Sequence, residues 1–271
     1  MQTALIEWAA GNGRDLPWRR TRDPWAVLVS ELMLQQTQVA RVVPRYTAFM
    51  ERFPTADSCA AAPVGEVVRR WAGLGYNRRA VNLHRTAVAI AEAGQFPDAL
   101  EGLLALPGVG PYTARAVLAF AFERDVAVLD VNARRAVSRL AGKPATQAVA
   151  DALVPPGRGW GWNQAVLDLG ATVCTGSMPA CDRCPVAACC VWRREGGPDP
   201  AVPAKRQSAF EGSDRQGRGR LVDALRLGPV ALGDVPSACG WPDDPARADR
   251  AAASLVADGL AVRANDELRL P

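Results

Sequence analysis

The stretch LPGVGPYTARAVLAF, residues 106–120, joins a turn rich in proline and glycine directly to an apolar helical pattern. Gly108 and Gly110 can take positive φ and leave space beside the backbone, because they have no Cβ. Pro111 suits the first position of a helix, where its missing N–H has no partner to lose. Exposed N–H groups and the helix dipole together form an anion site at such a turn. The stretch therefore predicts a helix-hairpin-helix motif that holds a nucleic-acid backbone without reading its sequence, with an ordinary tight helix connection as the plainer alternative.

The rest of the chain is dominated by apolar residues at helical spacing. At 271 residues and 49% hydrophobic content, it can bury one large core and a small second one. The pattern predicts an all-α fold with one short extended piece at 126–130. The expected helices lie within 1–21, from Pro24 through the run that ends at Tyr46, at 42–52, 63–72 and 79–93, on both sides of the turn, and at 131–140, 163–174, 216–227 and 245–258.

Residues 205–271 form a pattern of their own. They follow REGGPDPAVPAK, which has the composition of a linker, and they close with LAVR-ANDE-LRLP, which predicts a small hairpin. Helices followed by a hairpin indicate a winged-helix-like accessory module. This segment holds ten basic and ten acidic residues, so the excess of 32 Lys and Arg over 28 Asp and Glu lies entirely in 1–204. A phosphate-binding surface is expected there.

The sequence also indicates the cellular compartment of the protein. It opens with no cleavable signal, and no apolar run approaches the ~20 residues that cross a bilayer. We expect a cytoplasmic, intracellular protein with no membrane partner. Seven cysteines in a reducing compartment argue against a disulfide framework.

Two carboxylates stand in contrasting settings. Glu31 shares an apolar stripe with neighbours at helical spacing, Val27, Leu28, Leu32 and Leu34. Desolvation there would raise its pKa and favour the protonated form that a general acid needs. Asp130 ends an apolar run and starts a helix, where N–H donors favour the ionised form. Such a pair serves glycosidic cleavage; a solvent-facing glutamate and a plain N-cap are the structural alternatives.

Five of the seven cysteines fall between positions 174 and 190. Cys174, Cys181, Cys184 and Cys190 have the spacing C-x6-C-x2-C-x5-C, and four thiolates can hold a four-iron cluster or a tetrahedral zinc. Spacing alone leaves the metal open, and Cys189 competes with Cys190 for the fourth position. His84 is the only histidine, so a Ser-His-Asp triad cannot be built.

Residues 5 to 192 carry a series of motifs whose order is specific. The chain resembles the adenine DNA glycosylases of the MutY type, in the helix-hairpin-helix superfamily that includes endonuclease III. The matching motifs are LPWR, SELMLQQTQV, GLGY, LPGVGPYTA, LDVN, NQAVLDLGA and the four-cysteine loop.

The resemblance implies two helical domains with a cleft between them. One comprises 22–130 with the hairpin, the other joins 1–21 to 131–195, and 205–271 is the added module. The family's cofactor is a [4Fe–4S] cluster, whose fourth ligand matches Cys190 by spacing. The implied partner is double-stranded DNA with a mismatched or oxidised base pair, and the protein is expected to be a monomer.

The resemblance also assigns the chemistry. The family removes adenine mispaired with 8-oxoguanine or guanine, after the base leaves the stack. Glu31 then protonates the departing purine at N7. Asp130 stabilises the cationic sugar, or bonds to it transiently, and Asn132 positions that carboxylate or the water. In bifunctional relatives a lysine stands at the position of Tyr112; a phenol cannot form their Schiff base, so only hydrolysis is expected.

Contacts to DNA follow in the same way. Gln36, in the QQTQV motif with Thr37, and Tyr76 match residues that wedge into the duplex. Arg14, Arg19 and Gln164 match positions near the flipped base, with ordinary surface charges as the plainer reading of the two arginines.

Three features depart from the family pattern. Val131 replaces a small residue beside Asp130, Asn77 replaces a second aromatic, and the Nudix-like domain that reads 8-oxoguanine has no counterpart in 205–271. Because of Val131, a thymine or uracil mismatch glycosylase of the same superfamily remains an alternative function. A non-catalytic DNA-binding regulator with a metal loop is the alternative from another class.

Overall fold

The computed structural model describes residues 1–203 and 208–271, and its chain is mostly helical. The chain divides into two compact units, each described by itself below. Unit 1 comprises 1–27, 98–104 and 109–206, and unit 2 comprises 28–97, 105–108 and 207–271. The last residues of the expected linker and the first of the expected module, 204–207, lie outside the described residues.

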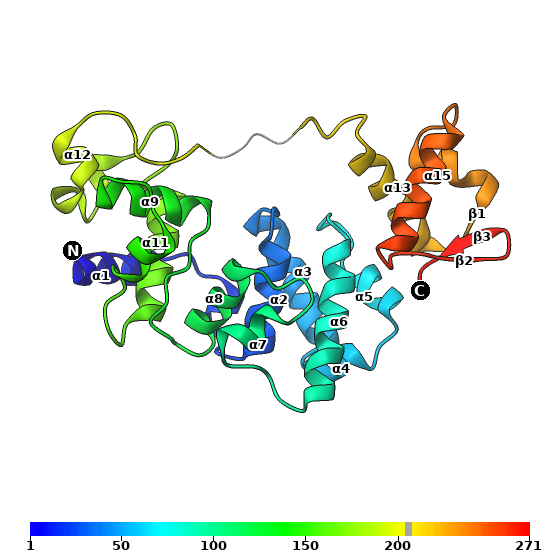
Figure 1. Cartoon of the computed structure of the whole chain (residues 1–271), viewed down its shortest axis with the longest axis horizontal. Helices are drawn as coiled ribbons and strands as arrows, with labels where there is room; N and C mark the ends of the chain where they lie inside the picture. Colours follow the sequence, from blue (N-terminus) through cyan, green and yellow to red (C-terminus); the bar gives the residue numbers. More distant parts are fainter. Residues whose placement is uncertain (204–207) are drawn as a thin grey trace. The chain divides into compact units, whose positions relative to one another are not determined.

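Unit 1 is built from helices of the N-terminal segment and the middle of the chain (Figure 1). Its elements are α1 Gln2–Asn12, η1 Pro17–Arg19, α7 Leu100–Leu104, α8 Pro111–Phe120, α9 Val131–Ala141, α10 Gln147–Asp151, α11 Gly159–Thr172, η2 Cys181–Arg183, η3 Ala187–Cys189 and α12 Val191–Glu195. Helix α11 packs against α1 and α9, and its Trp162 and Leu169 are buried in one core with Leu5 of α1. The N-terminal helix is therefore folded onto a segment about 160 residues away because both bury apolar faces there.

The piece at 126–130 is held by side chains rather than by a neighbouring strand. The amide of Ala127 donates to Asp151 Oδ1 at 2.8 Å, and that of Val128 donates to Asn163 Oδ1 at 2.8 Å. These bonds satisfy buried backbone donors, as an isolated extended segment requires. They also fix the chain where it enters Asp130.

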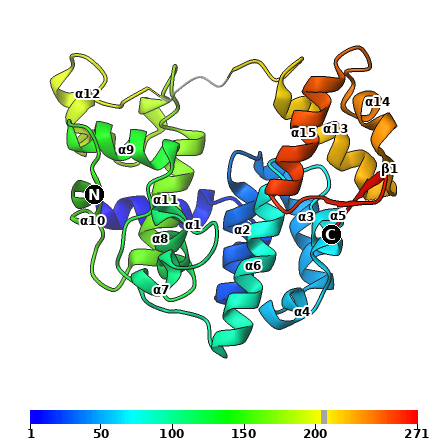
Figure 2. The ribbon, with the colours of Figure 1, turned by 45° about the vertical axis from the view of Figure 1, so that its right-hand side comes forward.

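Unit 2 begins within α2 Pro24–Leu34, which crosses the boundary between the units. Its other elements are α3 Val39–Arg52, α4 Ala56–Ala60, α5 Val64–Arg70, α6 Arg78–Ala93, α13 Asp214–Leu227, β1 Val230–Ala231, η4 Leu232–Asp234, α14 Val235–Cys239, α15 Pro245–Ala257, β2 Val262–Ala264 and β3 Glu267–Arg269. Helices α4 and α6 lie side by side (Figure 2). Phe49, Phe53 and Trp71 centre the core beneath them, with ring centroids 5.0 Å and 6.2 Å from Phe49.

The predicted run from Pro24 to Tyr46 is two helices rather than one. Helix α2 ends at Leu34, and Gln36 takes a left-handed φ of 56° before α3 begins. A left-handed residue cannot continue a right-handed helix, and the polar QQTQ sequence falls at this break. The short helices α4, α10, α12 and α14 were not predicted.

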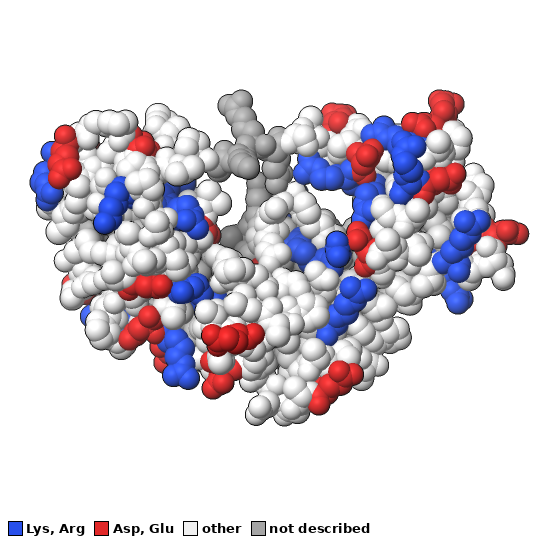
Figure 3. Space-filling view, viewed as in Figure 1, with Lys and Arg blue, Asp and Glu red and all other residues white. Residues whose placement is uncertain are grey.

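Residues 208–271 have the winged-helix-like form that their sequence predicts. Helices α13, α14 and α15 pack on one another, and β1, which precedes α14, joins the C-terminal hairpin in an antiparallel sheet of order β1-β3-β2. The hairpin pairs Arg263 with Leu268 and Ala264 with Glu267. Basic and acidic side chains alternate over this module on the face drawn in Figure 3, in line with its balanced charge.

The module is joined to α5 and α6 by polar contacts. The Arg226 guanidinium donates to Val68 O at 3.0 Å and to Asn77 Oδ1 at 2.8 Å. Arg78 lies 3.3 Å from Asp258, and the Gly65 amide donates to the carbonyl of Pro271 at 2.9 Å. The module is thus part of the same compact unit as these helices.

Replacing Arg226 with alanine should loosen residues 68–77. Only 9% of its side chain is exposed, and hydrogen bonds of a charged group contribute about 1.5–3 kcal/mol. Amide hydrogen exchange in 68–77 should then be faster by roughly tenfold or more. Arg250→Ala, at an exposed position of α15, is the matched control. Unchanged exchange in 68–77 would show that the contact does not hold the segment.

Part of the expected linker is folded. Asp199 Oδ2 accepts from Arg139 Nη2 at 2.6 Å, and Trp192 Nε1 donates to the carbonyl of Gly197 at 3.3 Å. The linker predicted from composition is therefore wrong for 194–199, because the ion pair between Asp199 and the buried Arg139 holds this segment against unit 1. Within the described segments, no helix has both the length and the apolar character of a membrane span.

Candidate active site and cysteine-lined cavity

Glu31 is a buried carboxyl on the apolar helix α2. Only 5% of its surface is exposed, and Leu28 and Leu32 beside it are fully or almost fully buried. The position predicted from the apolar stripe is confirmed, and the solvent-facing alternative is wrong. A carboxyl withdrawn from water favours its neutral form, which can donate a proton.

Asp130 caps helix α9. Its Oδ1 accepts from the Ala133 amide at 2.6 Å, and Asn132 Nδ2 donates to Oδ2 at 3.5 Å. The predicted cap is confirmed, but the net pKa shift of Asp130 is opposite to the one expected from the cap. Burial raises the pKa of Asp130 above its ordinary value, and the bonds from Ala133 and Asn132, with nearby Arg135, offset only part of that increase.

Arg135 connects Asn132 to the start of the cysteine loop. Its Nη2 donates to Asn132 Oδ1 at 2.9 Å and to the carbonyl of Gly170 at 2.7 Å. Its Nε donates to the carbonyl of Cys174 at 2.8 Å. One turn of α9 therefore joins the Asp130 site to the segment carrying the first cysteine. Arg135 was not predicted, although its place one turn after Asn132 puts both on the same helix face.

Arg14 and Arg19 converge on a buried carboxylate, Asp168 of α11. The Arg14 Nε lies 2.6 Å from Asp168 Oδ1, and the Arg19 Nη1 lies 2.7 Å from Oδ2. Burial alone would raise the pKa of Asp168, but the two guanidinium groups hold it below its ordinary value. The reading of both arginines as ordinary surface charges is wrong. Gln164, also buried, lies one helical turn before Asp168, and contact of these residues with a base stays a prediction.

Gln36 and Tyr76 share an unusual backbone conformation. Both are non-glycine residues with left-handed φ, 56° and 45°, and both are exposed. Thr37 belongs to the loop of Gln36, and its hydroxyl donates to the carbonyl of Leu74 in the loop of Tyr76 at 3.1 Å. The Tyr76 hydroxyl accepts from Arg215 Nη1 of α13 at 3.2 Å.

The two glycines of the turn at 106–111 have different backbone conformations. Gly108 has φ of 77°, and a Cβ there would lie 2.7 Å from Asn82 Nδ2, so a larger residue would be strained and would displace Asn82. Gly110 instead has φ of −96° and is the N-cap of α8, so the expectation of positive φ holds for Gly108 alone. Pro111 takes the first position of α8 as predicted, and Tyr112 follows it, half-buried.

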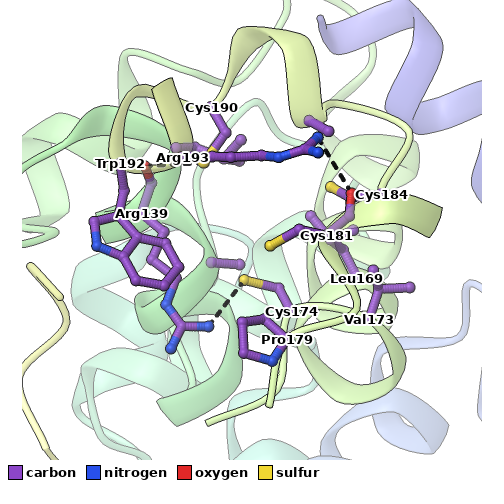
Figure 4. Close-up of a pocket in the computed structure, with 13 residues that line it drawn as sticks. Arg139, Leu169, Val173, Cys174, Pro179, Cys181, Cys184, Cys190, Trp192 and Arg193 are labelled. Carbon is purple, nitrogen blue, oxygen red and sulfur yellow. Dashed lines mark hydrogen bonds between the residues drawn. The ribbon is translucent and has the colours of Figure 1, made fainter. Parts of the chain in front are cut away.

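The four cysteines with the metal-ligand spacing line a single cavity (Figure 4). Arg139, Trp192 and Arg193 also line it, and Cys174 and Cys181 both face its interior. Cys190 lies in the cavity wall and is buried, whereas its neighbour Cys189 is exposed. Within 1–203 and 208–271, no three His, Cys, Asp or Glu side chains are gathered around one point as a single metal ion requires.

The cavity gives its thiols both apolar surroundings and polar partners. Burial raises the pKa of Cys184, and the nearby Cys174, Cys190 and Cys181 add to the increase. Arg139 Nη1 donates to Cys174 Sγ at 3.4 Å, while the Cys190 thiol donates to the Arg139 carbonyl at 3.3 Å. Four thiols lining one cavity, with a cation beside them, fit the donor set and charge of an anionic iron–sulfur cluster.

The predicted residues thus fall into two groups. Glu31, Gln36, Thr37, Tyr76 and Gly108 belong to unit 2. Unit 1 holds the others, namely Arg14, Arg19, Gly110, Tyr112, Asp130, Asn132, Gln164 and the four cysteines.

Comparisons with known proteins agree with these features. The HhH-GPD superfamily of base excision DNA repair proteins matches residues 29–153. An adenine DNA glycosylase of Mycolicibacterium smegmatis is 45% identical over 97% of this chain and 92% of its own length. The adenine DNA glycosylase of Homo sapiens is 41% identical, over 69% of this chain and 38% of its own. A match over 97% of the chain includes most of the C-terminal module.

Solved structures share the fold. A thermostable thymine-DNA glycosylase matches with a TM-score of 0.67 and 28% identity, over 71% of this chain and 94% of its own. A trapped covalent complex of endonuclease III with DNA matches with a TM-score of 0.61 and 22% identity, over 72% and 94%. The second likeness is one of fold alone.

Proposed function

Because the chain belongs to the adenine DNA glycosylases of the HhH-GPD superfamily, we propose that it excises adenine paired with 8-oxoguanine or guanine and does so by hydrolysis alone. Membership in this family of base excision repair enzymes removes the non-catalytic regulator from the alternatives. The observation that carries the proposed chemistry is the burial of Glu31, a carboxyl 5% exposed on an apolar helix. Its substrate would be double-stranded chromosomal DNA, which the protein would bind as a monomer.

In this mechanism Glu31 is the general acid. A neutral carboxyl donates its proton to N7 of the adenine and so converts the base into a better leaving group. The glycosidic bond then breaks with its electron pair going to the purine, and the sugar becomes cationic.

Asp130 acts on the sugar. As a carboxylate it would stabilise the positive charge at C1′, or bond to it until water replaces it. Asn132, which donates to Asp130 and accepts from Arg135, orients that carboxylate or the water. The water adds its oxygen to C1′ and releases a proton to solvent, from which Glu31 is reprotonated, leaving an abasic site and free adenine.

Other residues would hold the DNA. The turn at Gly108 and Gly110 is proposed to bind backbone phosphate through its N–H groups. Gln36 and Tyr76 would enter the duplex beside the mispair, while Thr37 supports their loops. Arg14, Arg19 and Gln164 would lie along the extruded base.

Cys174, Cys181, Cys184 and Cys190 would hold a [4Fe–4S] cluster in the cavity that they line. Such a cluster supplies four metal–thiolate bonds that couple metal binding to the folding of the loop. Arg139 and Arg193 at the same cavity would face its negative charge.

A thymine or uracil mismatch glycosylase is the second candidate. The solved structure of a thymine-DNA glycosylase, at 28% identity and a TM-score of 0.67, favours it specifically. Three duplexes separate the candidates: A opposite 8-oxoguanine, T opposite G, and U opposite G, each treated with alkali after the reaction. We expect strand cleavage at adenine only; cleavage at T or U without cleavage at A would reverse the assignment.

Borohydride should trap little covalent protein–DNA adduct, and strand scission should need added alkali. Tyr112 is the second residue of α8, and a phenol cannot form an imine with the opened sugar. Gel electrophoresis after borohydride treatment measures the adduct. Tyr112→Lys is the informative variant, because it places an amine there and should increase trapping. Efficient trapping by the unaltered protein would overturn the hydrolysis-only assignment.

A further inference from the structure

Arg79, near the start of α6, is a buried cation with an unusual set of partners. Only 7% of its surface is exposed. Its guanidinium donates to six backbone carbonyls and one hydroxyl, those of Leu32, Met33, Gln35, Leu74, Gly75 and Tyr76 and of Thr37. None of these acceptors carries a formal charge.

Three of these seven acceptors are carbonyls at or just after the end of α2. Nη1 lies 2.7 Å from the carbonyl oxygen of Leu32, 2.9 Å from that of Met33 and 2.6 Å from that of Gln35. Carbonyls in the last turn of a helix lack intrahelical partners, and the helix dipole favours a cation there. Burial lowers the pKa of Arg79 to about 10, so it remains charged near neutral pH.

Three further acceptors are carbonyls of the loop before α6. Nη2 lies 3.0 Å from the Leu74 carbonyl oxygen and 2.9 Å from that of Gly75, and Nε lies 3.3 Å from that of Tyr76. The same Nη2 donates to Thr37 Oγ1 at 3.0 Å. The planar guanidinium group of Arg79 therefore joins the loop of Gln36 to the loop of Tyr76.

Each of these loops contains one strained residue. A non-glycine residue with left-handed φ costs about 1–3 kcal/mol and persists only where its surroundings determine it. Gln36 and Tyr76 are two of the four such residues in the described chain. Arg79 binds the carbonyl immediately before each of them, at Gln35 and Gly75.

We propose that Arg79 is a positioning residue that fixes Gln36 and Tyr76 as one preformed wedge for the duplex. This inference rests on the proposed function, in which those two side chains enter the DNA. A wedge ordered in advance lowers the entropy lost when the base pair opens. Lysine cannot replace the arginine, since a single ammonium cannot span both loops.

The test compares paired with unpaired adenine. Single-turnover excision is measured at saturating protein on adenine opposite 8-oxoguanine and on the same adenine in a single-nucleotide bulge, which needs no wedge to leave the stack. Arg79→Lys should lower the rate on the paired substrate on the order of 10- to 100-fold and that on the bulge by about twofold at most. Arg85→Lys, at an exposed position of the same helix, should change neither rate.

Thr37 provides a second variant, which removes one of the seven acceptors of Arg79 together with the bonds of the hydroxyl to the Gln35 and Leu74 carbonyls. Thr37→Val should reproduce the selective loss in weaker form, and Thr37→Ser should restore the rate. Equal losses on both substrates, or no loss on the paired one, would overturn the positioning role. An unaltered protein that excises adenine from neither substrate overturns the proposed function itself and this inference with it.

Discussion

Replacing Glu31 with glutamine should lower adenine excision by about 10²–10⁴-fold, the range that a positioned general acid contributes. Glutamine has nearly the same shape, so the packing of α2 should be kept, but its amide cannot protonate the purine. Duplex affinity should stay close to that of the unaltered protein. Single-turnover excision and equilibrium binding on the same duplex measure the two properties.

The control for this variant is Glu51→Gln on α3, where the side chain is exposed. It should leave the rate unchanged, which separates loss of the acid from loss of one negative charge. An E31Q protein that retains more than about a tenth of the rate would contradict the general-acid role.

Replacing Cys190 with serine should remove most of the iron and unfold the loop that follows α11. Cys190 lines the cavity with the other three cysteines, whereas the adjacent Cys189 is exposed. Because metal binding and folding are coupled, a lost ligand should make the 174–190 segment sensitive to proteolysis. Cys189→Ser is the matched control and should keep its iron and its brown colour.

Metal analysis of the purified proteins decides this prediction. About four iron atoms for each chain is the expected content. A content of one zinc ion and no iron would contradict the cluster and would indicate a tetrahedral zinc site, the alternative that the cysteine spacing also allows. Equal iron loss in both serine variants would contradict the choice of Cys190.

Local sequence signals predicted the helices, the Asp130 cap and the buried place of Glu31. Each of these depends on neighbours within about one helical turn, which is the range that residue patterns encode. The same signals missed the direction of the Asp130 pKa shift, because burial outweighs the hydrogen bonds of the cap.

Long-range polar partners could not be predicted. Asp168 reads as an ordinary helical residue, yet it binds Arg14 and Arg19 from about 150 residues away. Arg79 looks like one charge among many, and its role depends on how the two loops meet. A chain with thirty arginines gives no sign of which few are buried.

The central claim is hydrolytic release of adenine, and one mass measurement tests it most directly. The protein reacts in heavy-oxygen water with a duplex carrying A opposite 8-oxoguanine, and the masses of the products are measured by mass spectrometry before any alkali is added. The account predicts free adenine and an uncut strand that has lost the base and gained one heavy oxygen at the abasic sugar. A strand of unchanged mass, or one already cleaved beside the sugar, would contradict it.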